Sequence, residues 1–146
     1  MAVTNTAAFG QTPRLMQALL NAAKAAPLGT SNTNAFSLGG VGVNGTIING
    51  IVAIPMNTLA TAAHIAIYHS TDSGTTLNIL AIGLLAAWTS AATTAPTPLN
   101  LANLNGSVIS VTNPLYIPYS ATTLLYASTS VAATTGIMVT ANGIDL

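Results

Sequence analysis

The chain contains very little charge. Of its 146 residues, only Arg14, Lys24, Asp72 and Asp145 are charged at pH 7, which is 3% of the sequence, against about 25% in ordinary globular domains. Glutamate and cysteine are absent, so disulfides and thiol chemistry are excluded. Because the net charge is zero, nothing repels neighbouring molecules, and such surfaces associate. We therefore expect most of the surface to be covered by other polypeptides.

The shortage of basic residues excludes two classes of partner. Two cations cannot neutralise a row of phosphates, so we expect no nucleic-acid partner. A peripheral membrane site also needs a basic cluster. The longest apolar run, 77–88, contains Asn78 and is shorter than the ~20 residues of a spanning helix. The N-terminus lacks the basic region and apolar stretch of a signal peptide, so we expect synthesis in the cytoplasm without secretion.

What the chain does contain is short apolar runs separated by turn residues. Apolar residues make up 51% of the sequence, and β-branched runs alternate with glycine, proline and asparagine. This pattern predicts an all-β protein, an antiparallel β-sandwich of jelly-roll-like or barrel-like form. A bulge is expected at Asn49-Gly50, and 89–107 is expected to be a long connection containing Pro96 and Pro98. Strands are predicted at 46–54, 63–70, 75–85, 107–111, 124–131 and 136–141, with 114–119 extended.

The clearest local signal is a hairpin whose turn contains Asp72, Ser73 and Gly74. Strand-like residues precede and follow this turn. We expect the Asp72 carboxylate to accept hydrogen bonds from turn amides, and Gly74 to adopt positive φ.

The N-terminal part is expected to be a flexible arm at 1–12, followed by a single domain at 13–146. Apolar residues in 14–23 recur at three- and four-residue spacing, which favours a helix over a strand. Pro27 and Gly29 end this element in either case.

The groups needed for catalysis are scarce. His64 and His69 are predicted to lie on opposite faces of one strand, and no third ligand is available to complete a zinc site. A triad of Ser73, His69 and Asp72 would lie in a hairpin tip without an oxyanion hole. The glycines near residue 40 precede a strand pattern, so they do not form a phosphate loop. We therefore expect no metal, no cofactor and no enzymatic activity.

The candidate interface residues are aromatic or charged. Tyr116, Tyr119 and Tyr126 can line a protein- or sugar-binding face, although packing in the core and on the sheet surfaces is the simpler interpretation. Trp88 is expected at a core boundary or a contact between subunits. Arg14 and Lys24 are candidates for pairing with an acidic partner, with solvated charge as the simpler interpretation.

Several segments resemble small β-rich virion proteins of tailed bacteriophages. They are QTPRLMQALL at 11–20, IVAIPMNTLA at 51–60, IAIYHSTDSGTTLNIL at 65–80 and LLAAWTSAATTAPT at 84–97. Such proteins look β-rich in the first segment, so the resemblance favours an extended 14–23. They usually carry Lys or Arg just after the hairpin, where this chain has Leu77 and Asn78. That departure favours apolar and backbone contacts over electrostatic docking.

The resemblance implies a capsid-associated or other structural role without enzymatic activity. The leading hypothesis is a capsid decoration or cement protein. Such a protein would be located in the virion and would oligomerise, with a trimer as the expected oligomer. It would bridge subunits of the major capsid protein or other virion proteins. Two alternatives stay open. One is a head-fibre, tail-accessory or glycan-binding module that uses the three tyrosines, and the other is a self-assembling shell or tube subunit.

Overall fold

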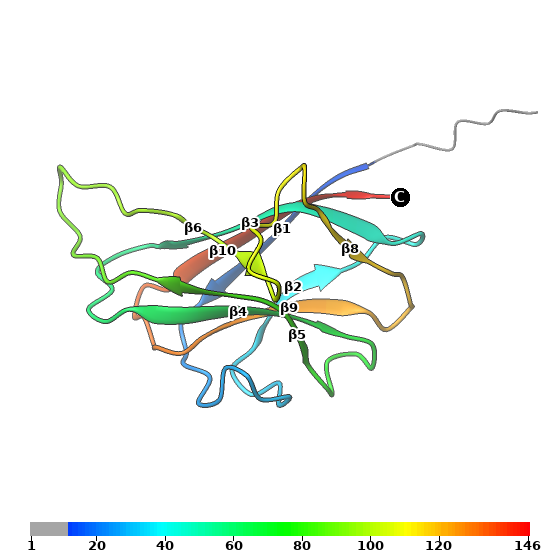
Figure 1. Cartoon of the computed structure of the whole chain (residues 1–146). Coiled ribbons are helices and arrows are strands. Elements are labelled where there is room, and N and C mark those ends of the chain that lie inside the picture. Colours follow the sequence, from blue (N-terminus) through cyan, green and yellow to red (C-terminus); the bar gives the residue numbers. More distant parts are fainter. Residues whose placement is uncertain (1–11) are drawn as a thin grey trace, which may run out of the picture.

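The computed structural model describes residues 12–146, which fold into two packed antiparallel β-sheets (Figure 1). The predicted all-β sandwich is therefore confirmed. No helix occurs among the described residues, so none there is long and apolar enough to cross a membrane. The predicted N-terminal arm lies outside the described residues except for Thr12, which already belongs to the first strand.

The two sheets, here named A and B, each contain five strands. Sheet A has the order β1-β10-β3-β6, and β8 also pairs with β3; sheet B has the order β2-β9-β4-β5-β7. The strands of sheet A are β1 (Thr12–Leu20), β3 (Thr46–Pro55), β6 (Leu99–Asn100), β8 (Leu115–Ile117) and β10 (Ile137–Asp145). The strands of sheet B are β2 (Phe36–Gly40), β4 (Ala63–Ser70), β5 (Asn78–Leu85), β7 (Ala102–Asn103) and β9 (Leu124–Thr129).

The first strand, β1, shows why helical spacing misleads here. Met16, Ala18 and Leu20 are buried in the core between the sheets, whereas Leu15 and Leu19 are exposed. Burial therefore alternates with a period of two, as in a strand. Apolar residues occupy both faces of β1, and this doubling produced the three- and four-residue spacing. The helix that this spacing favours is wrong, and the extended form implied by the resemblance is correct.

Most of the other predicted strands are present. The prediction at 63–70 coincides with β4, and those at 46–54, 75–85, 124–131 and 136–141 correspond to β3, β5, β9 and β10. The expected bulge in β3 is also confirmed, because Asn142 pairs with Gly50 and Gly143 with Ile48, which leaves Asn49 without a partner. The strand predicted at 107–111 is wrong, since this segment forms only isolated bridges. The predicted connection at 89–107 contains the short strands β6 and β7.

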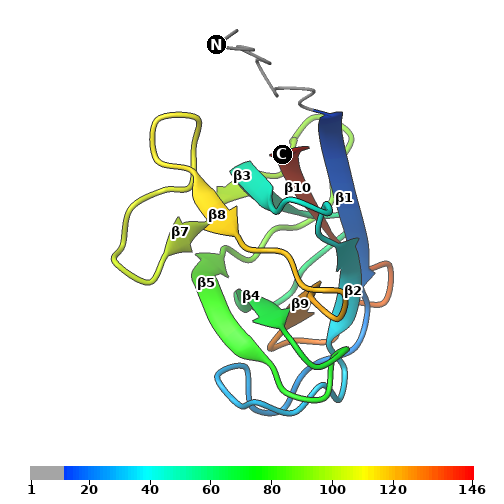
Figure 2. The ribbon, with the colours of Figure 1, turned by 90° about the vertical axis from the view of Figure 1, so that its right-hand side faces the viewer.

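The outer face of sheet B is covered by the chain itself. The segment 21–35 runs beneath β4, β9 and β5 in both ribbon views (Figures 1 and 2). It packs on a second small core formed by Ala66, Tyr68 and Leu77, all buried. The Tyr68 hydroxyl donates to the Pro27 carbonyl oxygen, and the Leu77 amide donates to the Thr30 carbonyl oxygen at 2.9 Å. This segment therefore forms a third layer on one side of the sandwich.

Candidate interaction surface

Two of the four charged side chains form an ion pair at one end of the sandwich. Nη1 of Arg14 on β1 lies 2.5 Å from Oδ2 of Asp145 on β10. Nη2 of Arg14 donates to the Gly40 carbonyl oxygen, also at 2.5 Å, which ties sheet A to the edge of sheet B. Asp145 Oδ1 accepts from the Thr46 hydroxyl at 2.6 Å. Arg14, expected as a solvated or partner-binding charge, is thus already paired within the chain.

The net effect of these contacts is a lowered pKa for the Asp145 carboxyl. Burial raises the pKa, but the hydrogen bonds from Thr46 and Arg14 and the positive charge of Arg14 outweigh it. Asp145 is therefore held in its charged form, as an in-chain partner of Arg14.

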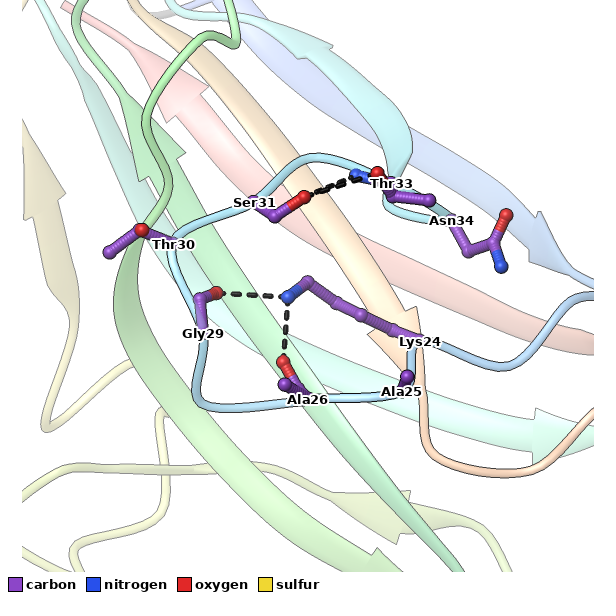
Figure 3. A pocket seen from close by; sticks show the side chains of 8 residues that line it. All are labelled: Lys24, Ala25, Ala26, Gly29, Thr30, Ser31, Thr33 and Asn34. Carbon is purple, nitrogen blue, oxygen red and sulfur yellow. Dashed lines mark hydrogen bonds between the residues drawn. The ribbon is translucent and has the colours of Figure 1, made fainter.

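Lys24 is buried, with 3% of its surface exposed, so the expected solvated charge is wrong. Its ammonium group donates to the Ala26 carbonyl oxygen at 2.7 Å and to that of Gly29 at 2.9 Å (Figure 3). It also lies 5.6 Å from the centroid of the Tyr68 ring, within cation–π range. Burial lowers the pKa of Lys24. Lys24 thus holds the covering segment in place on sheet B.

A pocket of about 340 Å³ surrounds Lys24 (Figure 3). Its lining is otherwise uncharged, and the ammonium group that could attract an anion is already bound by two carbonyl oxygens. The geometry therefore explains how the segment 24–34 folds around its lysine rather than how a ligand would bind.

Asp72 stabilises the hairpin turn, as predicted. Its carboxylate accepts from the Ser70 hydroxyl at 2.6 Å and from the Thr76 amide at 2.8 Å. The Ser70 bond, followed by those from Thr76, lowers the pKa of Asp72 to about 2. Gly74 adopts the expected positive φ of 93°, and Ser73 also adopts positive φ, at 58°. The turn residues therefore have a structural role, and no hydrogen bond joins Asp72 to His69 among residues 12–146.

These contacts engage all four charged side chains within the chain, and the outer face of sheet A contains none of them. Register places alternate residues of β1 and β10 on this face, together with residues of β3 and β8. Its exposed large apolar side chains are Leu15, Leu19 and Tyr116, with exposed fractions of 62%, 43% and 54%. We call this surface the A face, defined by Leu15, Gln17, Leu19, Met138, Thr140, Ile47, Val52, Ile54 and Tyr116.

The two outer faces of the sandwich therefore differ. In Figure 1 the segment 21–35 lies on the side of sheet B, whereas the A face looks the other way. The A face is apolar at most positions and polar only through uncharged groups such as Gln17 and Thr140. Exposed apolar patches of this kind mark sites of protein association. The A face is therefore the candidate interaction surface.

The three candidate tyrosines do not form one surface. Tyr116 on β8 pairs with Ile47 and belongs to the A face. Tyr126 on β9 pairs with Tyr68 and packs against the small core on the outside of sheet B. Tyr119 is exposed in the loop between β8 and β9. A stacking platform built from all three is thus not assembled within one copy.

Trp88 lies in the connection after β5. Its backbone forms a two-bond bridge with Leu59, at 2.8 and 2.9 Å, and its indole Nε1 is buried without an acceptor among the described residues. The residue is half-buried, at the end of the apolar run, so it anchors this long connection to the sandwich.

The histidines are separated, as predicted. Pairing with β9 places His69 on the face of β4 that carries Ile65 and Ile67, while His64 lies on the other face and is exposed. No group of three or more metal-ligating side chains occurs within 12–146.

Sequence reasoning missed Leu15 and Leu19, the exposed apolar residues of the A face. Their signal is the pair of apolar doublets in LMQALL, a pattern that also has helical spacing. Comparisons with protein-family models, with curated proteins and with solved structures found no match.

Proposed function

We propose that this protein is a non-enzymatic structural component of a bacteriophage virion, a decoration or cement protein that docks on the head through the A face. The observation that carries the proposal is the difference between the two outer faces. The chain covers sheet B with its own segment 21–35 and leaves the A face apolar and uncharged. The resemblance in the hairpin and the following apolar run gives the virion context.

The physical role would be passive. A rigid sandwich with an uncharged face adds buried area where it spans neighbouring capsid subunits, and specific interfaces bury about 1,000 Å² or more. Repetition over a shell multiplies each small contribution. Because the charged side chains are paired internally, docking would depend on apolar and backbone contacts and change little with ionic strength.

The test is to mix the purified protein with undecorated heads of the phage that encodes it and to measure co-sedimentation and heat resistance of the heads. We expect saturable, stoichiometric binding that is similar in low and high salt, and a higher temperature of head disruption. The variant Thr140→Lys places a charge in the middle of the A face and should abolish binding. The matched control Asn32→Lys adds the same charge to the exposed segment on sheet B and should bind normally.

Other outcomes would overturn this function. Absence of binding to heads would exclude a cement role. Tubes or shells formed by the purified chain alone would favour a self-assembling subunit. Binding to host glycans that is lost in Tyr116→Ala or Tyr119→Ala would favour the adhesive module.

A further inference from the structure

The strand β1 forms a long free edge of sheet A. It pairs with β10 over nine residues in an unbroken antiparallel register, and Figure 2 shows it along one rim of the molecule, with no described strand beyond it. In an antiparallel pair, every second residue directs its N–H and C=O groups away from the partner strand. Within 12–146, the backbone of β1 has no hydrogen bond except in the ladder with β10. Its outer edge can therefore accept another strand.

Beyond Pro13 and Arg14 at its start, this edge lacks the features that normally prevent strand pairing. Proteins protect edges with charges, prolines, bulges or very short strands. From Leu15 to Leu20 the strand has no charge, proline or glycine, and the charge of Arg14 is balanced by Asp145. The other edge strands described are shorter: β2 has five residues and an irregular register, and β6, β7 and β8 have two or three. Thus β1 is the regular edge open to pairing.

The sequence of β1 is complementary to itself in the antiparallel direction. Residues 15–19 read Leu-Met-Gln-Ala-Leu, a pattern that is nearly symmetric about Gln17. A two-fold axis at Gln17 places Leu15 opposite Leu19 of the second copy, on the outer face. On the inner face it places Met16, a large side chain, opposite the small Ala18. Arg14 faces Leu20, so no like charges are opposed. Cross-strand pairs of this kind stabilise sheets.

We propose that two copies of this chain pair along β1, antiparallel and about a two-fold axis at Gln17, to form one continuous sheet A. The two A faces become a single uncharged surface of twice the width. This inference adds to the proposed assembly role. What the dimer is for rests on that role, but the pairing along β1 does not. A second copy is the occupant because the self-complementarity lies in the sequence of β1 itself.

The test is the mass of the purified full chain by light scattering, with no capsid component present. We expect twice 14.6 kDa for the natural sequence. Gln17→Lys and Gln17→Glu each bring like charges together at the axis, and each should halve the mass. An equimolar mixture of the two variants should restore the dimer, because the opposite charges then face each other. That rescue also shows that both variants are folded.

Thr140→Lys is the control that separates this inference from the docking function. Thr140 on β10 is paired with Gln17 on β1. In the dimer the two copies of residue 140 therefore lie three strand spacings apart, about 14 Å. This distance exceeds the Debye length of ~10 Å at 0.1 M salt. We expect this variant to remain a dimer and yet fail to bind heads. Conversely, a dimer that binds no heads would refute the docking function alone.

Three results would overturn the pairing. The natural sequence could have the mass of one chain. It could form a dimer or trimer that Gln17→Lys does not change, which would place the contact elsewhere. Finally, a monomer whose outer β1 amides resist hydrogen exchange would show that residues of the same chain cover the edge.

Discussion

Arg14 and Asp145 join the first and last strands of the sandwich by an ion pair with Nη1 and Oδ2 2.5 Å apart. The same guanidinium bonds to the Gly40 carbonyl oxygen on β2, and the same carboxylate accepts from Thr46 on β3. Four strands of both sheets therefore meet at one pair of charges, although the two residues lie 131 positions apart in the sequence.

Arg14→Ala should destabilise the fold. It leaves the Asp145 carboxylate, whose side chain is 20% exposed, without its cation, and it removes the bond to Gly40. Loss of one partner of a partly buried pair of this kind costs about 1–3 kcal/mol. Urea unfolding measures the change. Arg14→Lys keeps the charge but not the two-pronged geometry, so its loss should be smaller. Equal stability of all three proteins would show that the pair contributes nothing.

The stability should fall in acid. The pKa of Asp72 is about 2 in the folded chain, against an ordinary value of 3.8, and the pKa of Asp145 is also lowered. The folded state therefore binds protons less readily than the unfolded state. The resulting stability is fully present above about pH 4 and is lost as the pH falls toward 2.

Unfolding measured from pH 6 to pH 2 checks this dependence. We expect a nearly constant free energy of unfolding down to about pH 4 and then a steady decrease. Asp72→Asn and Asp145→Asn should each make the fall in the free energy of unfolding below pH 4 less steep. The double variant should reduce the slope further. A curve of unchanged slope in the double variant would contradict the assignment of acid sensitivity to these two carboxyls.

The parts of the fold that sequence reasoning predicted are those fixed by local chemistry. The bounds of β4 and the turn at Asp72 and Gly74 follow from alternation and turn preferences within a few residues. The bulge at Asn49 likewise has a local signal in the Asn-Gly dipeptide. These features do not depend on what the distant chain does, so one sequence is enough to place them.

The parts that could not be predicted depend on residues distant in the sequence. Nothing local to Arg14 indicates that Asp145 will lie beside it. Lys24 resembles a solvated lysine until the segment 21–35 folds over Tyr68. The strand state of β1 is decided by its pairing with β10 over the full nine residues, which overrides a weak helical preference. The A face could not be located because its rows of side chains come from four separated segments.

The covering segment on sheet B should depend on the Tyr68 hydroxyl. Tyr68 is fully buried, and its hydroxyl is bonded to the Pro27 carbonyl oxygen and to the Ser128 hydroxyl, the latter at 2.7 Å. Tyr68→Phe leaves these buried groups without a partner, so we expect a loss of about 1–2 kcal/mol. Hydrogen exchange should accelerate at the Leu77 amide, which is bonded to Thr30 in the segment.

The matched control is Tyr119→Phe, which removes the same hydroxyl from an exposed loop. Its free energy of unfolding should change by less than about 0.5 kcal/mol. If Tyr68→Phe and Tyr119→Phe have equal effects on stability and exchange, the hydroxyl does not hold the segment.

Gly74 should tolerate alanine less well than Gly106, although both have positive φ, 93° and 80°. A Cβ at Gly106 meets no atom within 4 Å, so Gly106→Ala has only the backbone cost of about 1–2 kcal/mol. A Cβ at Gly74 would overlap the hydroxyl and ring of Tyr126, so Gly74→Ala should be more destabilising. Urea unfolding of Gly74→Ala and Gly106→Ala, each alone and each combined with Tyr126→Ala, separates the backbone cost from the overlap with Tyr126. Without the ring, the difference between the costs of the two alanines should shrink, because the overlap with Tyr126 is gone. A difference of unchanged size would show that Tyr126 is not what requires a glycine in this turn.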